Sequence, residues 1–264
     1  MSAAFAALLP ACASQVTAPA SVPEVAPGFL QGYLARADLP NSLTLLAAPP
    51  EHSGPAFAAD EAAYRSTRAL RGTARWDLAV QDADLKFPQL TGTYSCAVNA
   101  PLTPEATPHL YMLLRRSATD AGSAMGAAKN HYKRKRPFME YNELSCTPGD
   151  EAILSRNGSF PSGHTGIGWA WALILAEVAP DHTDAVLSRG YTFGQSRVVC
   201  GVHWQSDVNE GRVVAAGVVA RLHADPAFAA DLAAAKQELI AAHEKGLKPT
   251  RDCAAEAAAM ALHK

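Results

Sequence analysis

Residues 158–179 read GSFPSGHTGIGWAWALILAEVA, a turn rich in glycine and serine that leads directly into an apolar segment. The charge-free run from Thr165 to Ala176 has 12 residues, which is well short of the roughly 20 that a membrane-spanning helix needs. We therefore expect a soluble protein in which this run is a helix. The first amides of a helix have no partners within it, and together with the helix dipole they attract anions. The hydroxyl of Ser162 can add a donor, so the stretch predicts either an anion site or an ordinary capped turn.

Helical patterns precede and follow this stretch. Residues 55–70 are rich in alanine with apolar positions at period 3.6, and a second amphipathic pattern covers residues 76–87. Thr103 and the proline after it are typical of a helix start, and the pattern then runs to Arg136 with an expected break near Gly122. Further helices are expected at residues 164–179, 184–196, 203–224, 226–245 and 252–262.

The composition fits a folded domain of this kind. The 264 residues are 48% hydrophobic and 18% charged, with a formal net charge of -2. A disordered chain would be poorer in hydrophobic residues, and a nucleic-acid-binding protein usually carries a basic excess. Alternating β-type patterns are scarce and no repeat is evident. We predict an all-α fold, a compact helical bundle.

A basic run, KNHYKRKRP, occupies residues 129–137. Such a run is usually a solvated helix face or a patch for an anionic partner. Lys129 and Arg136 are seven residues apart, close to two helical turns, so on a helix they point the same way. Two cations on one face can bracket an oxyanion.

A third segment, SRVVCGVHWQSD at residues 196–207, contains a histidine and a carboxylate four residues apart. On a helix, the carboxylate of Asp207 can accept the Nδ1–H of His203. This leaves Nε2 with a free lone pair, as a nucleophilic histidine requires. The alternative is a structural hydrogen bond. Arg197 offers a further cation with bidentate geometry for phosphate.

The N-terminal residues resemble an export leader. Residues 1–23 carry no charge, and the apolar residues 3–11 precede Cys12 in the context LPAC, which is similar to a lipoprotein cleavage site. We expect residues 1–27 to be leader and linker, residues 28–264 to be the folded domain, and Cys12 to be a possible site of lipidation.

Four cysteines remain after Cys12, and an even number in an exported chain suggests two disulfides. Three pairings of Cys96, Cys146, Cys200 and Cys253 are possible. We favour Cys96–Cys146 and Cys200–Cys253, because both join neighbouring segments, and buried free thiols are the alternative. The chain has no CxxC pair, so a structural zinc site is not expected.

The three motifs occur in order as K-x6-R-P, P-S-G-H and S-R-x5-H-x3-D, separated by 23 and 31 residues. This pattern resembles the signature of the type 2 phosphatidic acid phosphatase (PAP2) superfamily, which includes the vanadium haloperoxidases. Within it, GSFPSGHT and GQSRVVCGVHWQSD are similar to the segments of bacterial class A nonspecific acid phosphatases. The resemblance covers roughly residues 28–245, including LPNS at 39–42 and DADL at 82–85.

The resemblance implies a phosphomonoester hydrolase that works through a phosphohistidine and needs no cofactor. His203 would be the nucleophile, Asp207 would hold its ring, and His164 would be the general acid and base. The phosphate oxygens would be bound by Lys129, Arg136, Ser162, the amide of Gly163 and Arg197. It also implies a periplasmic enzyme, a homodimer, inhibition by phosphate or vanadate, and a phosphotransferase side activity on alcohols.

Other interpretations of the three motifs are possible. The runner-up is a vanadium-dependent haloperoxidase, which would bind vanadate in the same cradle. A lipid phosphate phosphatase shares the motifs but usually has several spanning helices, and a phosphate-binding protein would not need His164. His164, His203 and Asp207 could also be taken for a metal site, but the surrounding cations would repel a divalent ion. No metal and no nucleic acid are expected as partners.

Overall fold

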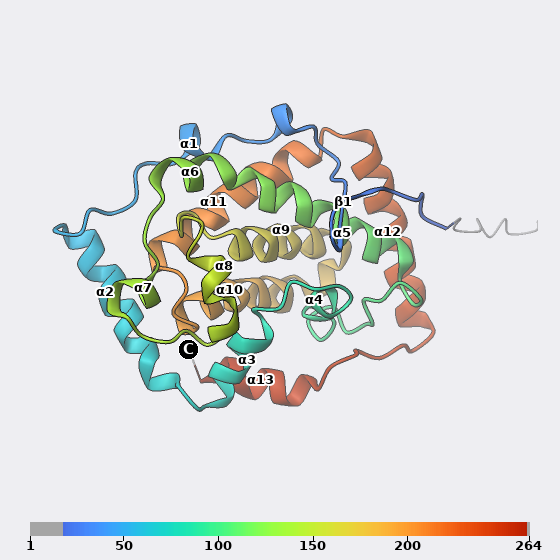
Figure 1. Ribbon diagram of the computed structural model, residues 1–264. Helices are drawn as coiled ribbons and strands as arrows, with labels where there is room; N and C mark the ends of the chain where they lie inside the picture. The colour runs from blue at the N-terminus through green and yellow to red at the C-terminus, as the bar shows by residue number, and fades with distance from the viewer. Residues whose placement is uncertain (1–17, 263–264) are drawn as a thin grey trace, which may run out of the picture.

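The computed structural model describes residues 18–262, and helices dominate the regular structure of this range (Figure 1). The expected all-α fold is confirmed. The strands in the described range are β1 (Glu24–Ala26) and β2 (Phe29–Leu30), which form a small antiparallel hairpin. This hairpin begins inside the segment that we expected to be leader and linker, while Cys12 lies outside the described residues.

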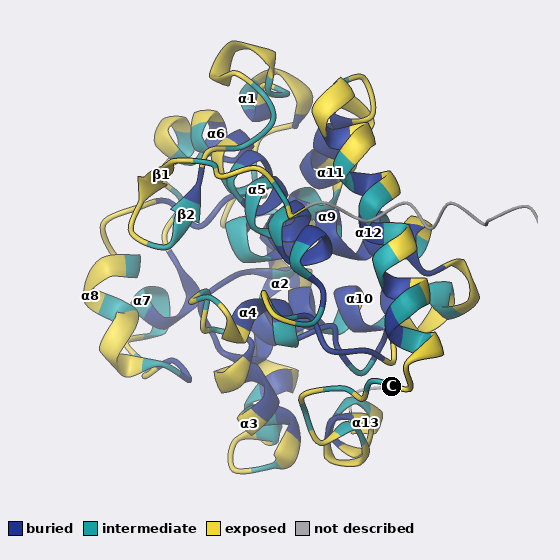
Figure 2. Cartoon of the chain, turned by 90° about the vertical axis from the view of Figure 1, so that its right-hand side faces the viewer, coloured by how far each residue is buried: buried dark blue, intermediate teal, exposed yellow. Residues whose placement is uncertain are grey.

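The centre of the bundle is α9 (Gly163–Val178), which is formed by the apolar segment that follows the glycine- and serine-rich turn. Around it lie α5 (Pro108–Ala124), α10 (Thr183–Val199), α11 (Gln205–Leu222) and α12 (Pro226–Glu244). A helix that is apolar on every side must be buried on every side. Figure 2 shows buried residues gathered along these central helices and exposed residues on the outward faces of the outer ones.

Shorter elements surround this core. They are α1 (Ser42–Leu45), α2 (Pro55–Thr67), α3 (Ala74–Gln81), α4 (Gln89–Gly92), α6 (Gly126–Tyr132), α7 (Pro137–Tyr141), α8 (Glu151–Leu154) and α13 (Cys253–Ala261), with 3-10 turns at Arg36–Asp38, Arg68–Leu70, Pro148–Asp150 and Pro180–His182. Several of them, with the loops that join them, lie over the N-terminal end of α9 (Figure 1).

Glycines allow α9 and α10 to pack in close contact. A Cβ atom added at Gly168 would lie 2.2 Å from the Cδ1 of Phe193, and one added at Gly190 would lie 2.4 Å from the Cβ of Ala172. A larger residue at either position would require a shift of the contacting side chain or of one helix. The relative position of the two helices is therefore fixed by direct contact.

Most of the expected helices are present, with differences at several of their ends. The helix expected from Thr103 begins at Pro108, and after the break it ends at Tyr132 rather than Arg136. It ends there because Lys133 adopts a left-handed conformation, with φ of 46°. The stretch expected to be helical over residues 76–87 is helical only to Gln81.

The chain forms two disulfides, but the pairing that we favoured is wrong. Cys96 is bonded to Cys253, and Cys146 is bonded to Cys200. The favoured pairing joined cysteines of neighbouring segments. In the fold, however, α13 packs against α3, and Cys253 meets Cys96, which lies 157 residues earlier in the sequence. The other bond closes a loop of 54 residues, where the amide of Cys146 also donates to the carbonyl of Cys200 at 2.9 Å.

Among residues 18–262, no single helix combines the length and apolar character that crossing a bilayer requires. Only α11 and α12 taken together reach that threshold, and they are bent by 96° with respect to each other.

The disulfide pairing predicts which cysteines become free when two are replaced. Cys96→Ser/Cys253→Ser should lower the free energy of unfolding by about 2–5 kcal/mol and expose no new thiol. Cys96→Ser/Cys146→Ser should instead release two thiols, because it breaks both bonds. Thiol titration in denaturant and urea unfolding measure these quantities. If Cys96→Ser/Cys146→Ser left one bond between Cys200 and Cys253, the pairing would be refuted.

Candidate active site

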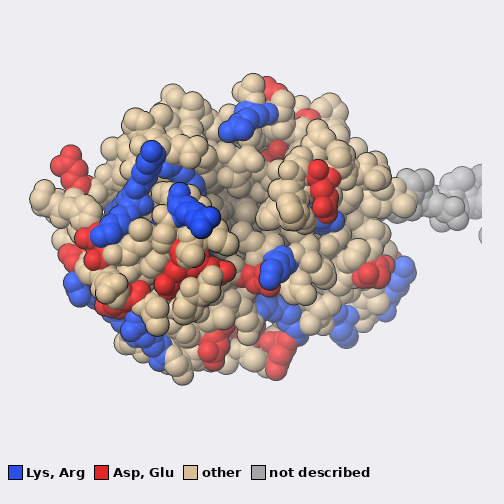
Figure 3. Space-filling view, viewed as in Figure 1, with Lys and Arg blue, Asp and Glu red and all other residues tan. Residues whose placement is uncertain are grey.

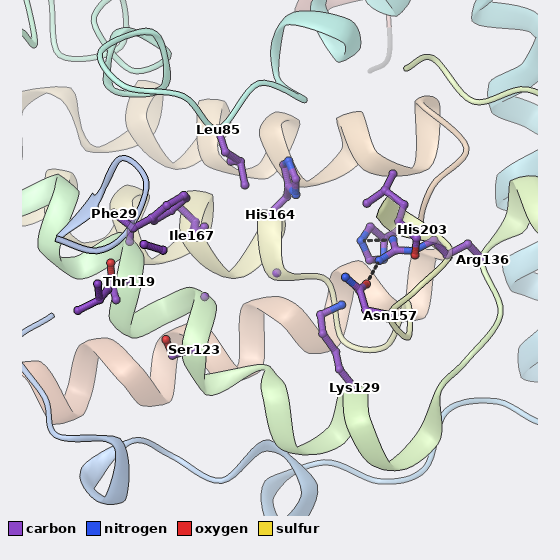
Figure 4. A pocket seen from close by; sticks show the side chains of 16 residues that line it. Phe29, Leu85, Thr119, Ser123, Lys129, Arg136, Asn157, His164, Ile167 and His203 are labelled. Carbon is purple, nitrogen blue, oxygen red and sulfur yellow. Dashed lines mark hydrogen bonds between the residues drawn. The ribbon is translucent and has the colours of Figure 1, made fainter. Parts of the chain in front are cut away.

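A cavity of about 410 Å³ opens beside the N-terminal end of α9 (Figure 4). The structure brings five of the expected site residues to its lining, from segments far apart in the sequence: Lys129, Arg136, Gly163, His164 and His203. A second cavity of about 590 Å³ adjoins it, is also lined by His164, and contains a sixth, Arg197. Ser162 and Asp207 are fully buried behind these walls.

The ring of His203 is held at both nitrogens. The Nη1 of Arg136 lies 3.0 Å from Nε2, and the Oδ2 of Asp207 lies 3.2 Å from Nδ1. A guanidinium can only donate, so Nε2 must accept and the ring proton must be on Nδ1. His203 is 2% exposed, and the lone pair of its Nε2 accepts from Arg136 at the cationic end of the cavity.

The contact between His203 and Asp207 was expected, but its structural setting was not. The expected helix over residues 203–224 begins only at Gln205, with Trp204 as the N-cap residue. The same Oδ2 that accepts from His203 also accepts from the amide of Trp204 at 2.9 Å. Asp207 therefore caps α11 and orients the histidine that immediately precedes this helix.

Arg136 reaches the cavity from a loop and not from a helix face. The expectation of one face shared with Lys129 was wrong in its reason, because α6 ends at Tyr132. The guanidinium of Arg136 donates to the carbonyls of Leu154 at 2.9 Å and Val202 at 3.0 Å. These bonds hold it in place at the His203 ring.

The loop at residues 157–159 contacts both of these cations. The Oδ1 of Asn157 accepts from Arg136 at 2.6 Å, and the carbonyl of Gly158 accepts from the Nζ of Lys129 at 2.9 Å. Figure 4 shows Lys129, Asn157, Arg136 and His203 together on one side of the cavity. The two cations are thus brought to one point although they do not lie on one helix.

Arg197 has donors that the protein does not use. Its side chain is 1% exposed, yet Nε and Nη1 donate to no acceptor in the described part of the chain. Burial and the charge of Arg136 lower the pKa of Arg197 to about 9. An arginine in this state is stabilised by any anion that reaches it, because the anion supplies acceptors and a compensating charge.

The start of α9 is fixed to α11. Ser162 is the N-cap residue of α9, and its Oγ accepts from the amide of Thr165 at 3.3 Å. Its own amide donates to the carbonyl of Asp207 at 2.9 Å. Gly163 follows beside Lys129, since a Cβ added there would lie 3.9 Å from the Cε of that lysine. The first turn of α9 and the Lys129 side chain therefore meet at the cavity.

His164 lies in the first turn of α9, to the left of His203 and above Lys129 in Figure 4. Its Nε2 is 3.0 Å from the carbonyl oxygen of Ala83. A carbonyl can only accept, so Nε2 is protonated and Nδ1 is the nitrogen that can gain or lose a proton. His164 and His203 thus present opposite tautomers.

Burial lowers the pKa of the two histidines, of Lys129 and of Arg136, and neighbouring positive charge adds to the effect at His203, His164 and Lys129. Burial first, and neighbouring arginines second, hold the pKa of His203 and of His164 well below its usual range. Burial and the charge of Arg136 lower the pKa of Lys129 to about 7. Burial lowers the pKa of Arg136 to about 10. An oxyanion bound among these groups would raise all of these values again.

Two residues that the sequence analysis did not single out hold Asp207 in place. Arg134 donates to the Oδ1 of Asp207 at 2.6 Å and to the Oδ2 of Asp60 at 2.8 Å. Asp60 also accepts from the amide and the hydroxyl of Ser206, at 2.8 and 2.5 Å. Arg134 was hidden in the basic run, and Asp60 lies 74 residues before it, so no local spacing linked them.

Basic side chains also lie outside the cavity. Lys133, Lys135 and Arg156 line a neighbouring depression of about 250 Å³. Figure 3 shows basic side chains gathered to one side of the hollow in this face. Such a field attracts anionic ligands toward the site. Within residues 18–262, no group of three or more His, Cys, Asp or Glu side chains is arranged to hold a metal ion.

Comparison with known proteins places this geometry in a family. Residues 106–229 match the model of the PAP2 superfamily. The non-specific acid phosphatase of Providencia stuartii is 46% identical over 207 residues, which are 78% of this chain and 84% of that protein. The acid phosphatase of Zymomonas mobilis is 46% identical over 75% of each chain. The non-specific acid phosphatase of Salmonella typhimurium is 42% identical over 75% of this chain and 80% of that protein.

The buried network around Asp207 predicts a large effect of a small change. Asp60→Asn keeps the shape of the side chain but removes the charge that pairs with Arg134. We expect it to lower the free energy of unfolding by about 2 kcal/mol or more. Asp38→Asn, in an exposed pair with Arg221, is the control and should change it by less than about 1 kcal/mol. Urea unfolding measures both, and equal effects would contradict the assignment.

Proposed function

Since this chain belongs to the PAP2 superfamily and is an acid phosphatase, we propose that it hydrolyses phosphomonoesters through a phosphohistidine at His203. The observation that carries this proposal is the pair of hydrogen bonds on the His203 ring. They place the ring proton on Nδ1, so Nε2 is unprotonated. Its lone pair accepts from Arg136 in the free protein, and a bound phosphate would have to take over this donor before Nε2 attacks phosphorus.

In the first step, Nε2 of His203 attacks phosphorus while the bond from phosphorus to the ester oxygen breaks. His164 gives its proton to the departing oxygen, so an alcohol leaves. The carboxylate of Asp207 stabilises the positive charge that develops on the His203 ring, which it contacts at Nδ1.

In the second step, His164 takes a proton from water, and the resulting hydroxide attacks the phosphoryl group. The bond to Nε2 breaks, inorganic phosphate is released, and both histidines return to their starting states. If an alcohol occupies the position of the water, the same step transfers the phosphoryl group, which is the proposed phosphotransferase side activity.

The remaining residues would bind the phosphate oxygens. Arg197 has donors without an acceptor in residues 18–262, and Lys129 and Arg136 add positive charge at the His203 end of the cavity. The amide of Gly163 and the hydroxyl of Ser162 complete the cradle at the start of α9. Phosphoryl transfer depends chiefly on positioning and charge stabilisation, and these groups supply both without a metal.

The vanadium haloperoxidase reading is not favoured, because the relatives reported above are named acid phosphatases. The two disulfides favour an oxidising compartment, and we propose export to the periplasm. A lipid anchor at Cys12 and a homodimer stay predictions.

The nucleophile is tested by hydrolysis of p-nitrophenyl phosphate at about pH 5–6. We expect turnover that resists EDTA and is inhibited by orthovanadate or phosphate. His203→Ala should lower kcat by at least about a thousandfold, because no phosphohistidine can form. His131→Ala is the control, since His131 is exposed on α6 and does not line the cavity. If the wild-type protein oxidised bromide with added vanadate and hydrolysed no ester, the proposal would be refuted.

The shifted pKa values predict an activity maximum below neutrality. The lowered pKa of His203 keeps the nucleophile neutral in mildly acidic solution. A bound phosphate dianion raises the pKa of His164, so the general acid is protonated in the complex. Lys129 loses its charge as the pH rises through about 7, which weakens phosphate binding above that value.

The pH profiles of kcat and kcat/KM should therefore differ. The alkaline limb of kcat/KM reports the free enzyme and should lie at lower pH than the limb of kcat, which reports the complex. Initial rates with p-nitrophenyl phosphate between about pH 4 and 9 measure both profiles. A flat profile, or a maximum in alkaline solution, would contradict the assigned roles.

A further inference from the structure

The cavity beside α9 has two chemically different ends (Figure 4). Lys129, Arg136 and His203 form the cationic end already described. At the other end, beyond His164, the walls are apolar. Figure 4 shows Phe29, Ile167 and Leu85 there, with the hydroxyls of Thr119 and Ser123 at the edge.

One apolar wall comes from the β1–β2 hairpin. Phe29 in β2 contacts the ring of Phe87 edge to face, with centroids 6.0 Å apart. Val25 in β1 also lines the cavity, although its side chain is 60% exposed. Apolar side chains that gather in one wall of an open cavity mark a candidate site for an apolar ligand.

The hairpin is held firmly against α5. Arg115 donates to the carbonyl of Gly28 at 2.8 Å, and the hydroxyl of Thr119 donates to the carbonyl of Leu30 at 2.7 Å. The two carboxylate oxygens of Asp120 then accept from the amides of Tyr33 and Leu34, at 2.9 and 3.2 Å. Arg115, Thr119 and Asp120 of α5 therefore hold residues 28–34 in place, so the wall formed by Phe29 is part of the folded structure.

The lining indicates which chemical group would fit. Among residues 18–262, no Asp or Glu side chain lines this cavity, and Asp84 and Asp150 line only the adjoining one. A cationic group would therefore have no carboxylate partner within the cavity itself. Its hydroxyls are those of Thr119 and Ser123, and the Thr119 hydrogen is already donated to Leu30. A polyhydroxylated group would therefore lose more hydrogen bonds to water than it regained. The volume, about 410 Å³, exceeds what a phosphate group alone requires.

We propose that this apolar end is the subsite for the leaving group, and that the enzyme prefers phosphomonoesters whose alcohol carries an apolar ring. Phe29, Leu85 and Ile167 determine this specificity. The inference rests on the proposed function, because it assumes that phosphate binds at the cationic end. It also explains why a hairpin outside the three sequence motifs lies over the site.

The test compares two substrates with leaving groups of similar chemistry, 2-phenylethyl phosphate and ethyl phosphate. Both release a primary alcohol, so the difference in kcat/KM reports contacts of the ring. We expect the wild-type enzyme to favour 2-phenylethyl phosphate by about tenfold or more, because the ring leaves water for an apolar surface. Equal values of kcat/KM for the two substrates would overturn the proposal.

Two variants locate the effect. Phe29→Ala removes one wall, and Gly122→Leu fills the cavity from α5, where a Cβ would lie 3.6 Å from the Cδ1 of Ile167 without a clash. Each should reduce the preference to about threefold or less, while ethyl phosphate is still hydrolysed, which shows that the variant is folded. Ile240→Ala, at an exposed position on α12, is the control and should keep the full preference.

The two levels of proposal fail in different ways. If His203→Ala still hydrolysed ethyl phosphate, the phosphohistidine mechanism would be wrong. If His203→Ala were inactive but Phe29→Ala and Gly122→Leu both kept the wild-type preference, the mechanism would stand and the leaving-group subsite would be wrong.

Discussion

The buried carboxylate of Asp207 is the group on which the fold and the site jointly depend. Its oxygens accept from Arg134, from the ring of His203 and from the amide that begins α11, while its backbone carbonyl accepts from Ser162. A buried charge is tolerated only where such partners surround it. The same bonds join the starts of α9 and α11 to the loop after α6, so the charge that orients the histidine also holds together the segments that form the cavity.

The site places several positive groups close together, and this arrangement is held by the surrounding backbone. The carbonyls of Leu154, at the end of α8, and of Gly158 and Val202, in the loops before α9 and α11, accept from Lys129 and Arg136, which offsets part of their mutual repulsion. Two nitrogens of Arg197 have no such partner among residues 18–262. The free protein therefore holds uncompensated positive charge at the point where an anion would bind, which favours a charged ligand over water.

The sequence predicted contacts between near neighbours well and distant contacts poorly. The bond between His203 and Asp207 follows from their spacing of four residues, although the helix begins only after the histidine. Arg136 reaches the cavity because Lys133 ends α6, and helical periodicity could not reveal that. The pairing of Arg134 with Asp60 and the bond from Cys96 to Cys253 depend on how distant segments return to each other. The spacing of residues within a motif does not indicate which distant segments will contact each other in the fold.

The tight contact between α9 and α10 has a consequence for the thermodynamics of catalysis. Because Gly168 and Gly190 bring these helices into direct contact, we expect the N-terminal amides of α9 to keep one orientation whether or not a ligand is bound. If phosphate binds at these amides as proposed, their dipoles are oriented before it arrives. Water would have to reorganise to solvate the same charge, whereas these dipoles would not, and the barrier would be lower by that reorganisation energy.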